Sequence, residues 1–139
     1  MDTDVLNNKL ESLAKCVKRI ESKMPQNLEQ LENDIDMQDI IVVNLERAVQ
    51  ICVDIASHIL LDYEQTAVQS MAENFTALAK HSVIPAELAE SLAHAVGFRN
   101  IAVHQYQSLN WAVFYSIITK NLTDFRSFAG YVSNLIFTK

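Results

Sequence analysis

The chain has 139 residues, so its length predicts one domain spanning residues 1–139 with one hydrophobic core. Half of the residues are hydrophobic, which excludes a disordered chain, and only 2 Gly and 2 Pro are present, too few for the many turns of a β-sandwich or barrel. A surplus of 17 Asp and Glu over 11 Lys and Arg gives a net charge of −6, which argues against a protein that holds nucleic acid by bulk charge.

The first predicted helix ends before Pro25, because proline breaks the backbone hydrogen-bond pattern of a helix. Its apolar side chains recur at alternating spacings of four and three residues, which places them in one narrow stripe. They are Leu6, Leu10, Leu13, Val17, Ile20 and Met24. Such a stripe fits a neighbouring helix of the same chain or a second subunit.

A second helix is predicted from about Leu28 to Leu61, with an apolar stripe wide enough for a core helix covered on more than one side. Four polar side chains form another line along this helix, at steps of three, four and four residues. They are Arg47, Gln50, Asp54 and His58. We interpret this line as a polar seam beside the core, and we keep Asp54 and His58 as supporting residues of a site supplied by another helix.

Three further helices are predicted in the second half of the chain. The polar stretch 63–66 is predicted as a loop, and a short helix follows over about Ala67 to His81. Pro85 opens the next helix, since proline is tolerated in a first turn. The last helix covers about Leu109 to Phe137, and its aromatic side chains are predicted to lie in the core. The fold class is therefore all-α, an antiparallel bundle of about five helices.

Cys16 and Cys52 lie within apolar helical patterns, so we predict buried, reduced thiols rather than a disulfide or a metal site. The four histidines form no His-Glu-x-x-His pattern, and we expect neither a metal nor a cofactor. His81 and His94 are left out of the candidate site. The acidic N-terminus lacks the apolar region of a signal peptide and no run of 18 uncharged apolar residues occurs, so a cytoplasmic location without a membrane span is expected.

The stretch from Gly97 to Tyr106 is the part of the sequence that carries chemistry. His104 can accept or donate a proton at neutral pH, and the guanidinium of Arg99 can stabilise charge on phosphate oxygens. These groups suffice to cleave a phosphodiester without a metal. Arg99 and His104 are therefore candidates for such chemistry, with the amide of Asn100 and the hydroxyl of Tyr106 close by in the sequence.

Helix geometry separates the two candidate residues. Arg99 and His104 are five positions apart, so their side chains diverge by about 140° on an ideal helix. Three arrangements remain open: a helix distorted near Gly97, a His104 at a fraying helix end, or a site assembled between two copies of the chain. We favour the shared site, because one short motif then contributes twice to one cleft. This arrangement predicts a homodimer.

The run from Arg99 to Tyr106 matches the R-x4-H-x-Y signature of the HepT-like toxins in the HEPN superfamily. The 45–50 segment, together with Asp54 and His58, and the long aromatic final helix also resemble that family. Ala102 stands where a larger aliphatic residue is common, a departure that affects packing and leaves the chemistry intact.

The resemblance implies a dimeric, all-helical, metal-independent ribonuclease toxin that cleaves tRNA or mRNA and is neutralised by a MNT-type nucleotidyltransferase antitoxin. Arg99 and His104 would be its catalytic pair and Asn100 the accompanying polar residue. Tyr106 would be the tyrosine to which the antitoxin can transfer AMP, which adds bulk and negative charge near the catalytic pair. The alternative is a noncatalytic helical partner or regulatory subunit of a nucleotidyltransferase.

Overall fold

The computed structural model describes residues 1–63, 70–104 and 108–138, and within these ranges it contains six helices and no strand. The helices are α1 (Thr3–Lys23), α2 (Leu28–Asn33), α3 (Ile35–Leu60), α4 (Met71–Lys80), α5 (Ala86–His104) and α6 (Trp111–Phe137). The all-α prediction is confirmed.

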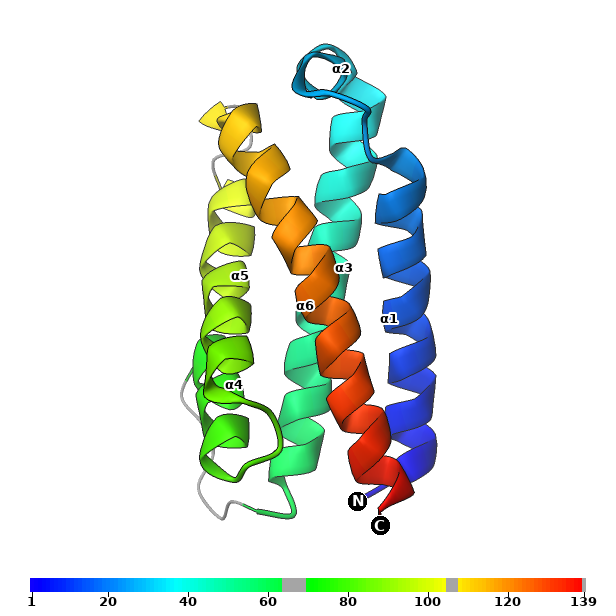
Figure 1. Ribbon diagram of the computed structural model, residues 1–139, viewed down its shortest axis with the longest axis vertical. Coiled ribbons are helices and arrows are strands. Elements are labelled where there is room, and N and C mark those ends of the chain that lie inside the picture. The colour runs from blue at the N-terminus through cyan, green and yellow to red at the C-terminus, as the bar shows by residue number, and fades with distance from the viewer. Residues whose placement is uncertain (64–69, 105–107, 139) are drawn as a thin grey trace.

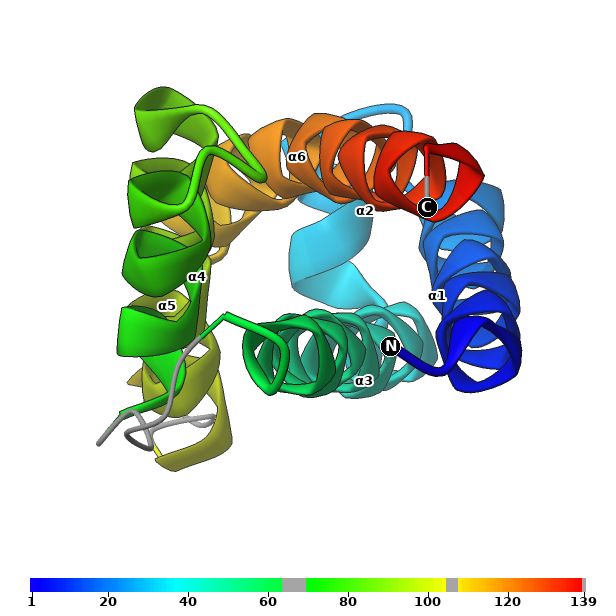
Figure 2. The ribbon, with the colours of Figure 1, turned by 90° about the horizontal axis from the view of Figure 1, so that it is seen from below.

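Four long helices, α1, α3, α5 and α6, alternate in direction and surround one core (Figures 1 and 2). The short helix α2 covers one end, where α3 begins and α5 ends, while α4 packs against α5 (Figure 1). Both chain termini lie at the opposite end. The predicted antiparallel bundle is therefore correct, and its geometry brings the start of α3 beside the end of α5.

The predicted helix from Leu28 to Leu61 is wrong in one respect, because the structure divides it into α2 and α3. Asp34 between them has an extended backbone (φ −122°, ψ 98°), and its Oδ1 accepts a hydrogen bond of 3.0 Å from the N–H of Met37. This contact caps the start of α3, and an aspartate that caps a helix cannot also continue the preceding one. The break accounts for six helices where about five were expected.

Side-chain caps also fix the start of the other helices. Asp2 accepts hydrogen bonds at the start of α1, and Asn110 does so at the start of α6. Ser70 caps α4, so that helix begins later than the predicted Ala67, which lies outside the described residues together with most of the predicted 63–66 loop. The carbonyl of Pro85 accepts from the N–H of Ala89, as expected for a proline that opens α5.

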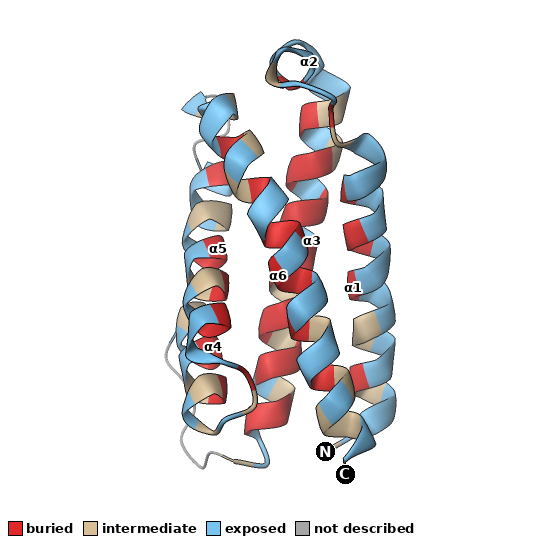
Figure 3. Cartoon of the chain, viewed as in Figure 1, coloured by how far each residue is buried: buried red, intermediate tan, exposed pale blue. Residues whose placement is uncertain are grey.

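All four long helices contain buried residues, and the buried segments alternate with exposed ones along each helix (Figure 3). The prediction that the aromatic residues of α6 lie in the core is correct for Phe114, Phe125 and Phe128, which are fully buried. Trp111 and Tyr115 are partly buried against the core, whereas Tyr131 and Phe137 are exposed. Phe128 meets Phe75 of α4 edge to face, with ring centroids 5.8 Å apart, and this contact ties α4 to the core. In the described ranges, no helix is both long and apolar enough to cross a lipid bilayer.

Candidate active site

The motif helix α5 runs without interruption from Ala86 to His104, through Gly97. Gly97 does not adopt a left-handed backbone conformation, and a Cβ at this position would meet nothing within 4 Å. The helix is therefore not broken at Gly97, which removes the first of the three arrangements considered for Arg99 and His104.

Arg99 faces α3 and is mostly shielded from solvent, with a side chain 22% exposed. Its Nη1 donates a 3.0 Å hydrogen bond to Oδ1 of Asn100, and its Nη2 lies 4.0 Å from Oε1 of Glu46 on α3. Its Nε is buried and has no hydrogen-bond partner among the described residues. The guanidinium is thus oriented by two neighbours and keeps donor capacity for an anionic ligand.

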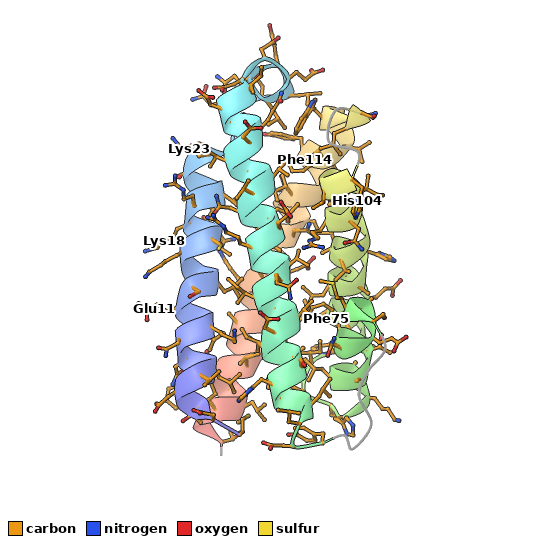
Figure 4. The ribbon with its side chains drawn as sticks, turned by 180° about the vertical axis from the view of Figure 1, so that it is seen from behind. Glu11, Lys18, Lys23, Phe75, His104 and Phe114 are labelled. Carbon is orange, nitrogen blue, oxygen red and sulfur yellow. The ribbon has the colours of Figure 1, made fainter. Side chains whose placement is uncertain are left out.

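His104 is the last residue of α5 and is exposed, toward the end of the bundle where α3 begins (Figure 4). Because α5 stays helical between them, Arg99 and His104 diverge by about 140° and lie about 7.5 Å apart along the axis. Tyr106 lies outside the described residues. Among the predicted site residues that the structure describes, Arg99 and Asn100 are the pair joined by a hydrogen bond.

Asp54 and His58 lie further along α3, away from Arg99. Asp54 is eight residues beyond Glu46, about 12 Å along the helix axis, and His58 is another turn away. The Oδ1 of Asp54 accepts a 2.9 Å hydrogen bond from Gln50, and its Oδ2 lies 3.7 Å from Nζ of Lys9 on α1. These contacts match the interpretation of a polar seam, here between α3 and α1.

Exposed apolar side chains surround the motif end of α5. Ile101 and Val103 are 49% and 40% exposed, and Val43, one turn before Glu46 on α3, is 40% exposed. Single exposed apolar residues are common on proteins, but Ile101 and Val103 lie in the last turn of α5 and Val43 lies in the first half of α3, which begins at that end of the bundle. A second molecule that covered them would bring its own groups close to the motif.

Glu46 was not assigned a role from the sequence, although it lies in the 45–50 segment that carries part of the family resemblance. Its contact with Arg99 joins residues 53 positions apart, and only the packing of α5 on α3 reveals it. Across residues 1–63, 70–104 and 108–138, His, Cys, Asp and Glu side chains form no group of three or more that could hold a metal ion.

Comparison with known proteins identifies the family of the chain. The family model described as "Ribonuclease HepT-like" matches residues 13–132. The mRNA nuclease HepT of Shewanella oneidensis is 36% identical over 125 residues, which cover 90% of this chain and 93% of that protein.

Solved structures give the same result. A tri-AMPylated HEPN toxin of Shewanella oneidensis in complex with a MNT antitoxin superposes with a TM-score of 0.87 at 34% identity, covering 96% of this chain and 99% of that one. A toxin–antitoxin structure with AMP-PNP also has a TM-score of 0.87 at 34% identity, with 94% and 98% covered. The match of the family model over residues 13–132, together with a nuclease relative similar over nine-tenths of the sequence, means that the chain belongs to the Ribonuclease HepT-like family.

Proposed function

We propose that this protein is the toxin of a toxin–antitoxin pair, an endoribonuclease that cleaves RNA without a metal ion. We treat residues 1–139 as one HEPN domain and Arg99 and His104 as its catalytic residues. The observation that carries the proposal is the partly buried guanidinium of Arg99, held between Asn100 and Glu46 on the helix that ends at His104. The nuclease relative from Shewanella oneidensis supports it.

The reaction follows from the chemistry of these two side chains. His104 accepts the proton of an RNA 2′-hydroxyl, whose oxygen then attacks the adjacent phosphorus to form a 2′,3′-cyclic phosphate while the P–O5′ bond breaks. The departing O5′ takes a proton from solvent, and the imidazolium of His104 returns its own proton to solvent. Arg99 stabilises the negative charge that gathers on the nonbridging oxygens. The nucleophile belongs to the substrate, so the reaction needs no metal-bound water, and DNA, which lacks the 2′-hydroxyl, resists cleavage.

We further propose that the cleft is shared by two copies of the chain. A single phosphate does not reach both Arg99 and His104 on one continuous helix when their side chains diverge by about 140°. In a symmetric dimer, Arg99 of one protomer and His104 of its partner can face the same phosphate. The exposed Val43, Ile101 and Val103 supply apolar surface for such an interface.

The net charge of the chain is compatible with RNA binding in the shared cleft. With a net charge of −6, the affinity for RNA must be concentrated in the cleft, where two copies of Arg99 meet. We place the activity in the cytoplasm, where the two buried thiols remain reduced.

The partner is a nucleotidyltransferase antitoxin of the MNT type, as in the complexed relative from Shewanella oneidensis. Tyr106 follows His104 by two residues and is the proposed acceptor of AMP. Each AMP adds a negative phosphate and a bulky nucleoside close to the catalytic pair, so it repels and sterically excludes the RNA backbone. Asp54 and His58 remain supporting residues in this proposal, acting through the packing of α3 and not by contact with Arg99.

Cleavage assays with matched variants test the catalytic assignment. Purified protein is incubated with tRNA and mRNA in EDTA, alongside Arg99→Ala and His104→Ala and two controls, Lys18→Ala and His94→Ala, which remove an exposed cation and an exposed histidine elsewhere. We expect both motif variants to lose at least about 100-fold in cleavage rate and both controls to retain it. Equal cleavage by all variants indicates a contaminant. No cleavage by the wild type favours a noncatalytic partner of the nucleotidyltransferase.

A mixed dimer tests the shared cleft. The Arg99→Ala and His104→Ala chains are coexpressed with different affinity tags, and dimers that carry both tags are purified. A cleft built from Arg99 of one protomer and His104 of its partner leaves one intact site in each mixed dimer, so about half of the wild-type activity returns. A mixed dimer as inactive as either parent would contradict the shared cleft and place both groups in one copy.

A further inference from the structure

A groove runs between α5 and α6 on the side of α5 away from the Arg99–Glu46 contact. The two helices lie close at the end where α6 begins and diverge toward the other end (Figure 1). The wider part of the groove has a volume of about 560 Å³, and a narrower part of about 240 Å³ continues it toward Phe98. Both parts share four lining residues, Ser91, His94, Lys120 and Asp124. The groove is therefore one elongated feature several helical turns long.

Two polar side chains in this groove are nine-tenths or more buried and lack partners. Asp124 of α6 is 9% exposed, and its Oδ2 has no hydrogen-bond partner among the described residues. Asn121, one turn earlier on α6, is 3% exposed, and its Nδ2 likewise has no partner in the part of the chain that the structure describes. Buried polar groups without partners are rare in folded proteins because each costs free energy, so these two atoms mark the groove as a place where a polar ligand can bind.

The charge around the groove favours a cation. Glu87, Glu90 and Asp124 contribute three carboxylates to its lining, against the single ammonium of Lys120. Burial raises the pKa of Asp124, and the charge of Lys120 opposes this rise without forming an ion pair with the carboxylate in the described ranges. An RNA backbone is repelled by this lining, whereas a basic group is attracted.

One of the two unpartnered atoms is a hydrogen-bond acceptor and the other is a donor, which restricts the chemistry of the ligand further. Oδ2 of Asp124 requires a donor, and Nδ2 of Asn121 requires an acceptor. A metal ion or a free amine satisfies only the first. A peptide segment satisfies both, because a basic side chain donates to Asp124 and a neighbouring main-chain carbonyl accepts from Asn121. The elongated shape of the groove suits an extended segment as well.

We propose that the α5–α6 groove binds a segment of a partner protein whose arginine or lysine side chain pairs with Asp124 while its backbone accepts from Asn121. The groove thus forms a protein-docking site separate from the Arg99–His104 cleft. This assignment does not depend on the nuclease activity, because none of its lining residues belongs to the proposed catalytic pair.

Titration of the uniformly ¹⁵N-labelled full chain with two peptides tests the proposal. The probes are the acetylated and amidated pentapeptide Ala-Asn-Arg-Asn-Ala and its counterpart with citrulline, a neutral analogue, in place of arginine. We expect the arginine peptide to shift the amide signals of residues 86–98 and 116–131 in a saturable manner, with an affinity at least tenfold higher than that of the citrulline peptide. No saturable shift, shifts confined to other helices, or equal affinity for both peptides would overturn the proposal.

Two variants and one small probe complete the test. Asp124→Asn should weaken binding of the arginine peptide at least tenfold, whereas Glu11→Gln, which changes the net charge equally at an exposed position on α1, should leave it within twofold. Ethylguanidinium alone, which has the cation but no carbonyl, should bind at least tenfold more weakly than the peptide, and equal affinity would overturn the peptide-docking assignment in favour of a simple cation site. The comparison of the two peptides on the unmodified chain remains decisive even if Asp124→Asn fails to fold.

Discussion

Nη2 of Arg99 on α5 lies 4.0 Å from Oε1 of Glu46 on α3, across the contact between the two helices. The Arg99 side chain is 22% exposed and that of Glu46 is 34% exposed, so water screens the pair only in part. A partly shielded carboxylate restricts the rotamers of the guanidinium and aligns its remaining donors. Glu46 therefore acts in our proposal as a positioning residue, which touches Arg99 and not the substrate.

We expect Glu46→Gln to lower kcat for RNA cleavage by about tenfold, because the guanidinium loses its orienting charge. KM for RNA should not rise, since one negative charge near the phosphate has been removed. Steady-state kinetics of Glu46→Gln and Glu46→Asp check this, and the aspartate variant should recover part of kcat. Glu29→Gln, an exposed change on α2, serves as the control. An unchanged kcat in Glu46→Gln would contradict a positioning role.

The sequence could predict the helices because their signals are local. Apolar spacings identified the faces of α1 and α3 that become buried, and the aromatic positions of α6 placed Phe114, Phe125 and Phe128 in the core. The break at Asp34 was missed because its signal is a single capping side chain inside a continuous apolar pattern. The spacing of apolar residues does not distinguish one continuous helix from two consecutive helices at this position.

The candidate site was predictable only as a motif. Arg99, Asn100 and His104 form a local pattern, and their divergence on a helix follows from elementary geometry. The role of Glu46 depends on how α5 packs on α3, which no local pattern contains. The same limit applies to Asp54, whose contact with Lys9 depends on the packing of α1 against α3.

The two cysteines are predicted to be chemically inert in the folded protein. Burial raises the pKa of Cys16, an effect that nearby Arg47 partly opposes, and burial raises the pKa of Cys52 strongly. A thiol with a raised pKa has little thiolate at neutral pH, and the thiolate is the nucleophile. At pH 8, we expect a disulfide reagent such as DTNB to react with neither thiol within minutes, and with both after unfolding in urea.

Cys16 should react before Cys52, because Cys16 is 8% exposed and Cys52 is fully buried. Mass spectrometry of samples labelled slowly shows which of the two thiols reacts first. A Ser12→Cys variant supplies an exposed thiol on α1 that should react within the mixing time. Rapid reaction of Cys52 in the folded chain would show that α1 and α3 separate easily.

Asp124 is predicted to destabilise the fold at neutral pH. Because burial raises its pKa, the folded state binds the proton more tightly than the unfolded state, and stability falls as pH rises from the ordinary value of 3.8 through the raised one. We expect Asp124→Asn to increase the free energy of unfolding by about 1 kcal/mol at pH 7. This gain should shrink as pH falls through the raised pKa of the folded state, and it should vanish below 3.8, where the carboxyl becomes protonated in both states.

Urea denaturation at pH 4, 5.5 and 7 measures this effect, with Glu11→Gln as the control for removal of an exposed carboxylate. The control should show no comparable gain, since its carboxylate remains in water in both states. A stabilisation of Asp124→Asn that is independent of pH would show that the carboxylate charge is not its cause.

Ser82 follows the end of α4 and has a left-handed backbone conformation, with φ of 60°. Residues other than glycine adopt this conformation at a cost in free energy. The conformation lets the N–H of Val83 donate to the carbonyl of Leu78 over 2.9 Å, and the N–H of Ser82 donate to that of Ala79 over 3.0 Å. These two bonds satisfy carbonyls at the helix end. Relief of the strain outweighs the greater flexibility of glycine in the unfolded chain, so Ser82→Gly should stabilise the protein by about 0.5–1 kcal/mol.

Ser82→Ala is the matched control, because alanine keeps the Cβ that causes the strain and removes only the hydroxyl. Urea denaturation should therefore place Ser82→Ala close to the wild type and Ser82→Gly above both, with RNA cleavage unchanged in all three. Equal gains from glycine and alanine would instead implicate the serine hydroxyl. A loss from glycine would mean that the entropy of the unfolded chain exceeds the strain released at this turn, and that α4 ends here because of its tertiary contacts.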